Sequence, residues 1–280
     1  MVDNWFTSSA GVRCPRIVYG TAWKQADTEA LVTMALGMGF RGIDTACQPK
    51  HYNEPGVGAG VAACRGTIAR AQLYLQTKFT PASGQDPARI PYDPRAPLAE
   101  QVHESCAASL RNLQTDYLDA LLLHSPLASP QQTLEAWRAM ESLVAQGAVR
   151  QLGISNCYHL PLLEQLHQVA QIKPAVLQNR FYADSGYDRE IRAFCRERRI
   201  LYQSFWTLTA NPHLLASATL TGLASRYARD PAQVLFRYLT QVDVVPLTGT
   251  RSESHMREDL AIFEFELTPA ECGAVETLLT

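Results

Sequence analysis

The 280 residues include 46% hydrophobic and 19% charged side chains, a composition that favours a folded globular chain over a disordered one. The 25 Lys and Arg residues are nearly balanced by 27 Asp and Glu residues, so the net charge of −2 offers no basic surface to nucleic acid or an anionic membrane. The N-terminus lacks a signal-peptide pattern, and the apolar run Ala120–Leu123 is far too short to span a bilayer. We therefore expect a cytoplasmic protein with a small-molecule partner, without nucleic-acid or membrane partners.

The chain contains 7 cysteines, which are spread along its length without a Cys-x-x-Cys pair. An odd number of scattered thiols is typical of a reducing compartment and differs from a disulfide framework or a zinc site. We expect free thiols and no bound metal.

Short, β-rich apolar runs alternate along the chain with segments whose apolar residues are three and four positions apart. This second spacing, seen from Leu134 to Val144 and from Leu163 to Val169, predicts helices. Each interval between runs is long enough for one crossover helix. The expected strands lie at 17–19, 42–43, 73–75, 118–123, 151–154, 175–177, 200–202 and 242–245.

Eight alternating strand and helix units favour a closed parallel barrel of the TIM type, (β/α)8, over an open doubly wound sheet. No stretch of the sequence reads as an interdomain linker, so we expect residues 1–280 to form a single domain. The segment from Trp5 to Pro15 precedes the first strand and is predicted to form a β-hairpin at the barrel floor. The proline-rich segment from Pro81 to Pro97 is predicted to be a long loop.

Polar side chains stand where several of these strands end. Buried parallel strands are normally apolar, and the rim at their carboxyl ends carries the chemistry of a barrel of this kind. Asp44, Lys78 and His124 end the second, third and fourth strands, and Tyr52 lies in the loop after the second. Singly, each could be a helix cap or a structural side chain. Together they supply the proton donor, the charge and the carbonyl-orienting group that a carbonyl reduction needs.

Several motifs resemble those of the aldo-keto reductase superfamily, and they occur in the family's order over nearly the whole chain. Gly39–Ala46 followed by Tyr52-Asn53-Glu54 is similar to the first family signature, and Val149–Asn156 is similar to the second. Further similarity lies in Leu75–Lys78, Leu121–Pro126 and Val244–Pro246. The resemblance implies a barrel enzyme that reduces aldehydes or ketones with a nicotinamide cofactor.

The resemblance also implies roles for individual residues. Tyr52 would be the general acid, supported by Lys78 and Asp44, and His124 would orient the substrate. A nearby ammonium favours the phenolate, so we expect Lys78 to lower the pKa of Tyr52 while Asp44 keeps the lysine charged. The residues implied for the nicotinamide end are Ser155, Asn156 and Gln178, which would bind the carboxamide, and Phe205, which would stack on the ring.

At the phosphate end of the cofactor, the expected binding residues depart from the family pattern. Leu247 and His255 stand where the family often has lysine and arginine, so we expect NADPH, with NADH as a less sharply excluded alternative. Arg257 and the helix start after Ser252 are further candidates for binding the phosphate. The residues predicted to bind this end are Thr248, Thr250, Arg251, His255 and Asp259.

The loop before Glu54 is longer than the usual family pattern, which makes His51 and Cys47 rivals of Tyr52. A buried, inert thiol is the favoured interpretation of Cys47. Glu54 could belong to the site, but the favoured interpretation is that it begins and caps the next helix.

Phe79 and Trp206 are expected to line the carbonyl site together with Tyr52. Because the sequence stops at Thr280, without a long C-terminal loop, we expect an open site that accepts aromatic and bulky aldehydes.

Two other functions remain open on the sequence alone. The same fold serves as a cofactor-binding regulatory subunit in some proteins, and a rim lysine such as Lys78 is suited to a Schiff-base aldolase. We expect a monomer or a weak homo-oligomer.

Overall fold

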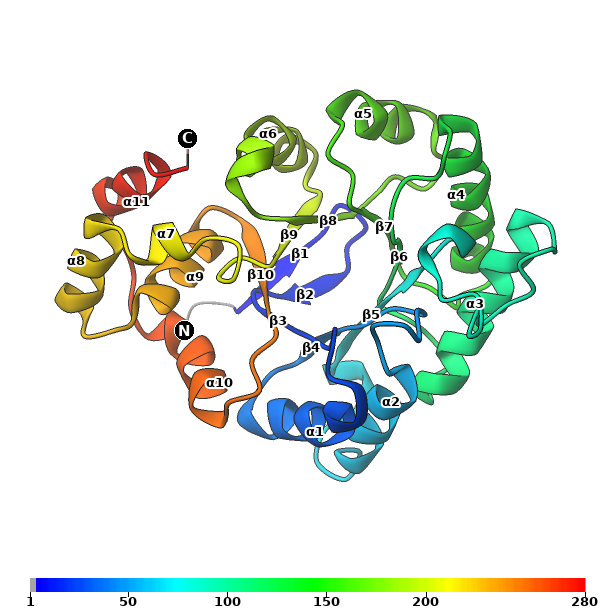
Figure 1. Ribbon diagram of the computed structural model, residues 1–280, viewed down its shortest axis with the longest axis horizontal. Helices are drawn as coiled ribbons and strands as arrows, with labels where there is room; N and C mark the ends of the chain where they lie inside the picture. Colours follow the sequence, from blue (N-terminus) through cyan, green and yellow to red (C-terminus); the bar gives the residue numbers. More distant parts are fainter. Residues whose placement is uncertain (1–3, 280) are drawn as a thin grey trace.

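Residues 4–279 are described by a computed structural model, shown in Figure 1. Eight parallel strands close a barrel in the order β10-β3-β4-β5-β6-β7-β8-β9, so that strands consecutive in the chain are neighbours in the wall. The predicted TIM-type (β/α)8 architecture is confirmed. The barrel strands are β3 (Val18–Gly20), β4 (Gly42–Asp44), β5 (Tyr74–Phe79), β6 (Ala120–Leu123), β7 (Leu152–Ser155), β8 (Val176–Arg180), β9 (Leu201–Phe205) and β10 (Val244–Thr248).

Helices surround the barrel, as Figure 1 shows looking onto its end. Most connections contain one helix, whereas the connection from β9 to β10 contains three. The helices are α1 (Thr28–Met38), α2 (Glu54–Ala63), α3 (Leu98–Leu113), α4 (Pro130–Ala145), α5 (Leu160–Val169), α6 (Arg189–Arg198), α7 (Pro212–Leu215), α8 (Ala218–Tyr227), α9 (Pro231–Gln241), α10 (Glu253–Leu260) and α11 (Pro269–Glu276).

The N-terminal hairpin is present and closes one end of the barrel. Strands β1 (Trp5–Thr7) and β2 (Arg13–Pro15) pair antiparallel, and Figure 1 shows them lying across the barrel axis. Cys14 is fully buried among apolar side chains inside the barrel. In the hairpin turn, Ser8 Oγ donates a 2.6 Å hydrogen bond to Gln151 Oε1. These contacts place the hairpin at the floor, opposite the carboxyl ends of the strands.

The last strand begins later than the sequence pattern predicts. Val242 is the C-cap residue of α9, and Asp243 has a left-handed backbone with φ of 61°. The chain therefore turns at these two residues, and extended structure starts only at Val244 and continues to Thr248. The apolar pattern of 242–245 does not distinguish the end of a buried helix from the beginning of a buried strand.

Helices α2 and α3 pack closely, and a glycine permits the close approach. A Cβ added at Gly58 would lie 2.0 Å from the carbonyl oxygen of Asn112 on α3. Helix α2 begins at Glu54, two residues after Tyr52. The packing of α2 on α3 therefore fixes the position of the loop that carries Tyr52.

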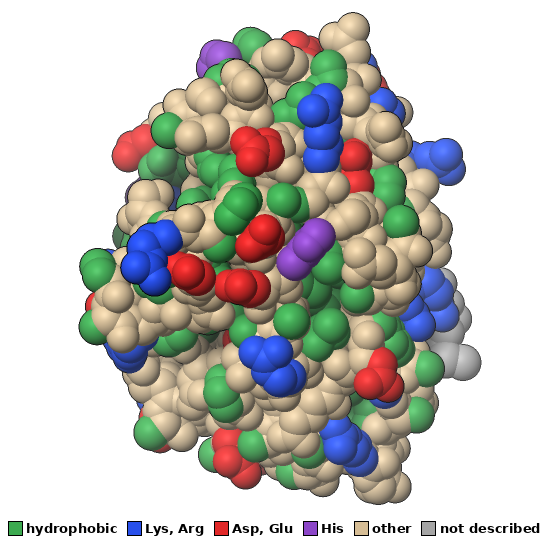
Figure 2. Space-filling model, turned by 90° about the vertical axis from the view of Figure 1, so that its right-hand side faces the viewer, with side chains coloured by type: hydrophobic (Ala, Val, Ile, Leu, Met, Phe, Trp, Pro, Cys, Tyr) green, Lys and Arg blue, Asp and Glu red, His purple; other side chains and the backbone are tan. Residues whose placement is uncertain are grey.

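The outer surface carries both signs of charge. Figure 2 shows the face formed by the elements on the right of Figure 1, where acidic and basic side chains are interspersed with scattered apolar ones. Within residues 4–279, the helices are all too short or too polar to cross a bilayer.

Candidate active site

A cavity of about 900 Å³ opens at the carboxyl ends of the barrel strands. It is bordered by strand ends, by the loops that follow them and by residues of α9 and α10. The sequence-predicted residues that border it are Asp44, Tyr52, His124, Ser155, Asn156, Gln178, Phe205, Trp206, Thr248, Thr250, Arg251, His255 and Asp259.

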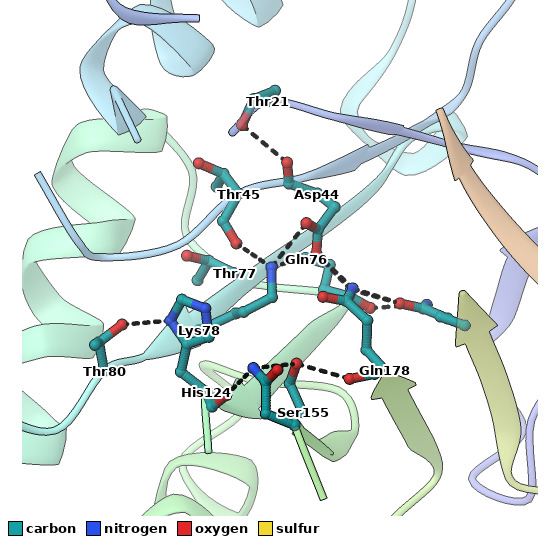
Figure 3. Close-up of polar contacts among 12 residues, drawn as sticks. Thr21, Asp44, Thr45, Gln76, Thr77, Lys78, Thr80, His124, Ser155 and Gln178 are labelled. Carbon is teal, nitrogen blue, oxygen red and sulfur yellow. Dashed lines mark hydrogen bonds and ion pairs between the residues drawn. The ribbon is translucent and has the colours of Figure 1, made fainter. Parts of the chain in front are cut away.

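Lys78 lies behind the cavity wall, where it forms a buried ion pair with Asp44. Its Nζ donates to both Asp44 carboxylate oxygens, each at 2.7 Å, and to the carbonyl oxygen of Thr45 at 2.8 Å (Figure 3). Burial lowers the pKa of Lys78, and the negative charge of Asp44 opposes that shift. The three acceptors match the three N–H donors of an ammonium group. This arrangement suits a charged lysine with a fixed orientation.

Glutamine amides inside the barrel donate hydrogen bonds to the Asp44 carboxylate. Gln76 Nε2 donates to Asp44 Oδ1 and to Gln203 Oε1, both at 2.7 Å. Gln178 Nε2 donates to the same two oxygens at 3.0 and 2.9 Å. The sequence analysis missed Gln76 and Gln203. Both could have been identified from the sequence, because each is a polar residue in the middle of a strand that should be apolar on both faces.

Tyr52 borders the cavity between Lys78 and His124. The Lys78 ammonium lies 5.4 Å from the centroid of the Tyr52 ring, and the Tyr52 and His124 ring centroids are 6.0 Å apart. Burial and the negative charge of Asp44 raise the pKa of Tyr52. The expected lowering of this pKa by Lys78 is therefore wrong for this structure. The physical reason is that the phenol is buried next to the negative charge of Asp44, and both disfavour the phenolate.

His124 is an uncharged imidazole with one nitrogen held in place. Burial, followed by the positive charges of Lys78 and His51, lowers the pKa of His124 to about 3. Its Nδ1 lies 2.6 Å from Thr80 Oγ1, a contact drawn in Figure 3. The other nitrogen, Nε2, has no hydrogen-bond partner among the described residues and is available to a ligand.

The two rivals of Tyr52 do not border the cavity. The His51 ring lies against Trp23, with ring centroids 3.8 Å apart. Cys47 is buried, and burial raises the pKa of its thiol, so it is a poor nucleophile. Tyr52 is thus the residue of the three that faces the space where a substrate would bind.

Glu54 opens α2 but does not cap it, which corrects the expected role. Asn53 is the N-cap residue, and its side chain accepts a hydrogen bond from the Gly56 N–H. The Glu54 carboxylate is buried instead. Its Oε1 accepts hydrogen bonds from Thr77 and Ser109, at 2.6 and 2.8 Å. Glu54 therefore ties the start of α2 to β5 and α3.

Phe79 does not reach the cavity, and its predicted place in the substrate site is wrong. Successive side chains of a strand point to opposite faces. Since Lys78 points into the barrel, Phe79 points outward, where its ring lies 5.6 Å from that of Tyr92. Trp206, by contrast, borders the cavity and is half-exposed.

The amide and hydroxyl groups predicted for the nicotinamide lie side by side on β7 and β8. Ser155 Oγ donates to the Gln178 carbonyl at 2.7 Å, and Asn156 Nδ2 donates to the His124 carbonyl at 2.9 Å. Asn156 has a left-handed backbone with φ of 52°, a conformation that asparagine tolerates well. Gln178 Oε1 receives no hydrogen bond from the described residues, which leaves an acceptor at the cavity.

The far end of the cavity contains cations that the sequence analysis only partly identified. Arg251 is paired with Asp27 and also donates to the Trp23 carbonyl at 2.9 Å. Lys24, which was not predicted, borders the cavity and donates to the Gly249 carbonyl. Burial and the charge of Arg251 lower the pKa of Lys24 to about 8. No motif distinguishes this lysine from solvated ones before the loops are assembled.

The remaining predicted residues of this region bond to one another. Thr248 Oγ1 donates to Asp259 Oδ2 at 2.7 Å, and burial raises the pKa of Asp259 to about 6. Arg257 pairs with Glu253 on the same helix and lies outside the cavity wall. Thr250 and His255 border the cavity next to the N-terminus of α10.

The sequence profile of the Aldo/keto reductase family matches residues 16–280. This chain belongs to that family. It is therefore related to oxidoreductases, and two relatives illustrate this. It is 31% identical to a glyoxal reductase of Bacillus subtilis, covering 96% of this chain and 90% of the relative. It is 28% identical to a methylglyoxal reductase of Yersinia pestis, covering 90% and 84%.

Solved aldo-keto reductase structures have the same fold. An aldo/keto reductase from Brucella melitensis matches with a TM-score of 0.84 and 27% identity over 99% of both chains. An aldo-keto reductase of Bombyx mori, solved in complex with NADP, matches with a TM-score of 0.81 and 24% identity, covering 98% of this chain and 92% of that one.

Proposed function

We propose that this aldo-keto reductase, acting as a single domain, reduces aldehydes or ketones to alcohols with NADPH, and that Tyr52 is the general acid. The observation that supports this most strongly is the position of Tyr52 and His124 on one wall of the cavity, directly above the buried Asp44–Lys78 pair. The names of the bacterial relatives, which are reductases of glyoxal and methylglyoxal, agree with a carbonyl substrate.

The cavity has groups that suit both ends of the cofactor. At one end, Gln178 Oε1 is a free acceptor for a carboxamide N–H, and Ser155 and Asn156 lie beside it. At the other end, Lys24 and the N-terminus of α10 offer positive charge and free N–H groups to phosphates. When bound, the cofactor supplies the hydride for the carbonyl carbon. The complex of the Bombyx mori relative with NADP favours the phosphorylated form.

The protein's own contribution is to hold the carbonyl and to provide a proton. His124 is neutral, and in the tautomer whose Nδ1 accepts from Thr80 its Nε2 carries a proton that it can donate to the carbonyl oxygen. Tyr52, whose pKa is raised, keeps its proton over the physiological pH range. It gives that proton to the alkoxide that forms, because an alkoxide is a much stronger base than a phenolate. The phenolate left behind faces the buried Asp44–Lys78 pair, with the Lys78 ammonium 5.4 Å from the centroid of its ring.

The Schiff-base alternative has little support in the geometry. A nucleophilic lysine needs a free, deprotonated amine that reaches the substrate. Lys78 Nζ is hydrogen-bonded to three oxygens and is absent from the cavity wall. We therefore do not propose an aldolase. A purely regulatory role would require an inactive site, and the groups needed for turnover are present.

The experiment that tests the proposal is a turnover assay with aldehydes and ketones, in which NADPH or NADH oxidation is matched to the alcohol formed. We expect oxidation that depends on the carbonyl compound, with NADPH as the better cofactor. A parallel incubation with borohydride and carbonyl substrate, analysed by mass spectrometry, should leave Lys78 unmodified. Tight cofactor binding without turnover of any carbonyl would instead indicate a regulatory protein.

A further inference from the structure

We propose that Arg180 binds a carboxylate on the carbonyl substrate, so that the preferred substrates are aldehydes or ketones that carry an acid group. This inference rests on the proposed function and names the substrate class of the same site. Arg180 borders the cavity, and its guanidinium has no hydrogen-bond acceptor among residues 4–279.

Arg180 is held in position by aromatic rings. Its guanidinium carbon lies 4.2 Å from the centroid of the Trp206 ring and 5.1 Å from that of Tyr182. Its backbone N–H donates to the Tyr158 hydroxyl at 2.9 Å. Stacking leaves the edge of a guanidinium, where its donors lie, open to a planar partner. The side chain is therefore already oriented before any ligand binds.

The charge of Arg180 is not compensated within the described residues. The other cations of this site have partners: Lys78 is paired with Asp44, Arg251 is paired with Asp27, and Lys24 donates to a carbonyl. No ion pair or side-chain hydrogen bond involves the Arg180 guanidinium in residues 4–279, and its Nε is buried without a partner. An uncompensated guanidinium at a cavity wall is a ready site for an anion.

Its place in the barrel favours the substrate over the cofactor phosphates as the source of that anion. Arg180 is two residues beyond Gln178 on β8, so both side chains point to the cavity, with Arg180 roughly 7 Å nearer the mouth. Gln178 lies at the proposed nicotinamide end, beside Asp44. The cations suited to phosphates, Lys24 and Arg251, lie on the loops after β3 and β10. We therefore expect the anion that binds Arg180 to be a carboxylate of the substrate.

The test compares two aldehydes that differ in charge, 4-carboxybenzaldehyde and its methyl ester, in wild type and in Arg180→Met. The methionine keeps an apolar stem of similar length and removes the charge. Arg226→Met, on α8 outside the cavity, is the matched control. We expect wild type to prefer the acid. Arg180→Met should lower kcat/KM for the acid at least tenfold, mainly through KM, and change that of the ester less than twofold.

The affinity for NADPH, measured by calorimetry, should be unchanged in Arg180→Met. A weaker affinity would assign Arg180 to the cofactor and overturn the proposal, as would an equal loss for the acid and the ester. Turnover of the ester reports on the proposed function independently of Arg180. If neither aldehyde is reduced, the binding of benzoate to the NADPH complex tests the role of Arg180 without turnover. A loss of benzoate binding in Arg180→Met supports the proposal, and equal binding in both proteins overturns it.

Discussion

Asp44 is the residue on which the polar interior of the barrel converges. It accepts hydrogen bonds from the Lys78 ammonium and from the amides of Gln76 and Gln178. A buried carboxylate surrounded by donors and paired with one cation is stable as an intact pair, whereas loss of one partner leaves a buried charge without compensation. The pair that we propose to support the chemistry is thus also a structural element of the barrel mouth.

Lys78→Met should therefore abolish turnover and also destabilise the protein by about 3–5 kcal/mol, because Asp44 would be buried without its cation. Urea unfolding followed by circular dichroism measures the second effect. The double variant Asp44→Asn/Lys78→Met should recover much of the stability and none of the turnover. Equal unfolding free energies for wild type and Lys78→Met would contradict the structural part of this account.

Lys24 should give cofactor binding a distinctive pH dependence. Its pKa is lowered to about 8 by burial and by Arg251, so the free enzyme loses this positive charge as the pH rises above that value. The dissociation constant of NADPH should be constant below about pH 7, begin to rise between pH 7 and 8, and rise by up to about tenfold by pH 9.5, since protonation and anion binding are linked. In Lys24→Met the affinity should be weaker but independent of pH. Wild-type affinity that stays flat to pH 9.5 would exclude Lys24 as a phosphate ligand.

At the scale of elements, α2 links the site to the helical layer. Asn53 caps this helix, Glu54 is hydrogen-bonded to β5 and α3, and Gly58 allows its backbone to approach Asn112. Because Tyr52 directly precedes these anchors, a shift of α2 away from α3 would move the phenol relative to His124. The position of the proposed general acid therefore depends on packing outside the barrel.

Gly58→Ala should destabilise the protein by about 1–3 kcal/mol, because the new methyl group would overlap the Asn112 carbonyl. The helical glycine Gly222 on α8 is a matched control, since a Cβ there meets nothing within 4 Å. Gly222→Ala should be neutral or slightly stabilising. Thermal unfolding of both variants gives the comparison, and equal melting temperatures would show that α2 and α3 are not tightly packed at this point.

The loops after β3 and β10 are joined by the Asp27–Arg251 pair, and we expect this pair to affect the choice of cofactor. An arginine already bound to a carboxylate must leave it, or share it, before it can bind a 2′-phosphate. Asp27→Asn should thus increase the ratio of kcat/KM for NADPH to that for NADH several-fold, and Arg251→Met should lower it. Steady-state kinetics with both cofactors tests this. If the two variants leave the ratio unchanged, the 2′-phosphate binds elsewhere.

For the whole molecule, the sequence predicts the barrel well because every repeat carries the same signal. Eight apolar runs separated by helical spacing give the architecture, and polar strand ends such as Asp44 and His124 then fall on one rim. Most of the predicted site residues border the cavity for this reason. The direction in which Phe79 points could have been inferred from Lys78, because alternate strand residues face opposite sides.

Contacts between distant parts of the chain could not be predicted in the same way. Gln76 and Gln203 meet inside the barrel although 127 positions separate them, and Arg251 meets Asp27 across 224 positions. The lowered pKa of Lys24 and the raised pKa of Tyr52 depend on burial that exists only after the barrel has closed. Such properties follow from the assembled site and have no local sequence signal.

The role of Tyr52 as proton donor is tested most directly by the rate of a single turnover in Tyr52→Phe, which removes only the phenolic hydroxyl. With a reducible aldehyde and saturating NADPH, we expect the rate to fall by about 10²- to 10⁴-fold, while the dissociation constant of NADPH changes less than twofold. Tyr227→Phe, whose hydroxyl donates to Glu271 outside the cavity, is the control and should react like wild type. A Tyr52→Phe variant that reduces the aldehyde at close to the wild-type rate would contradict the assignment of Tyr52 as the proton donor.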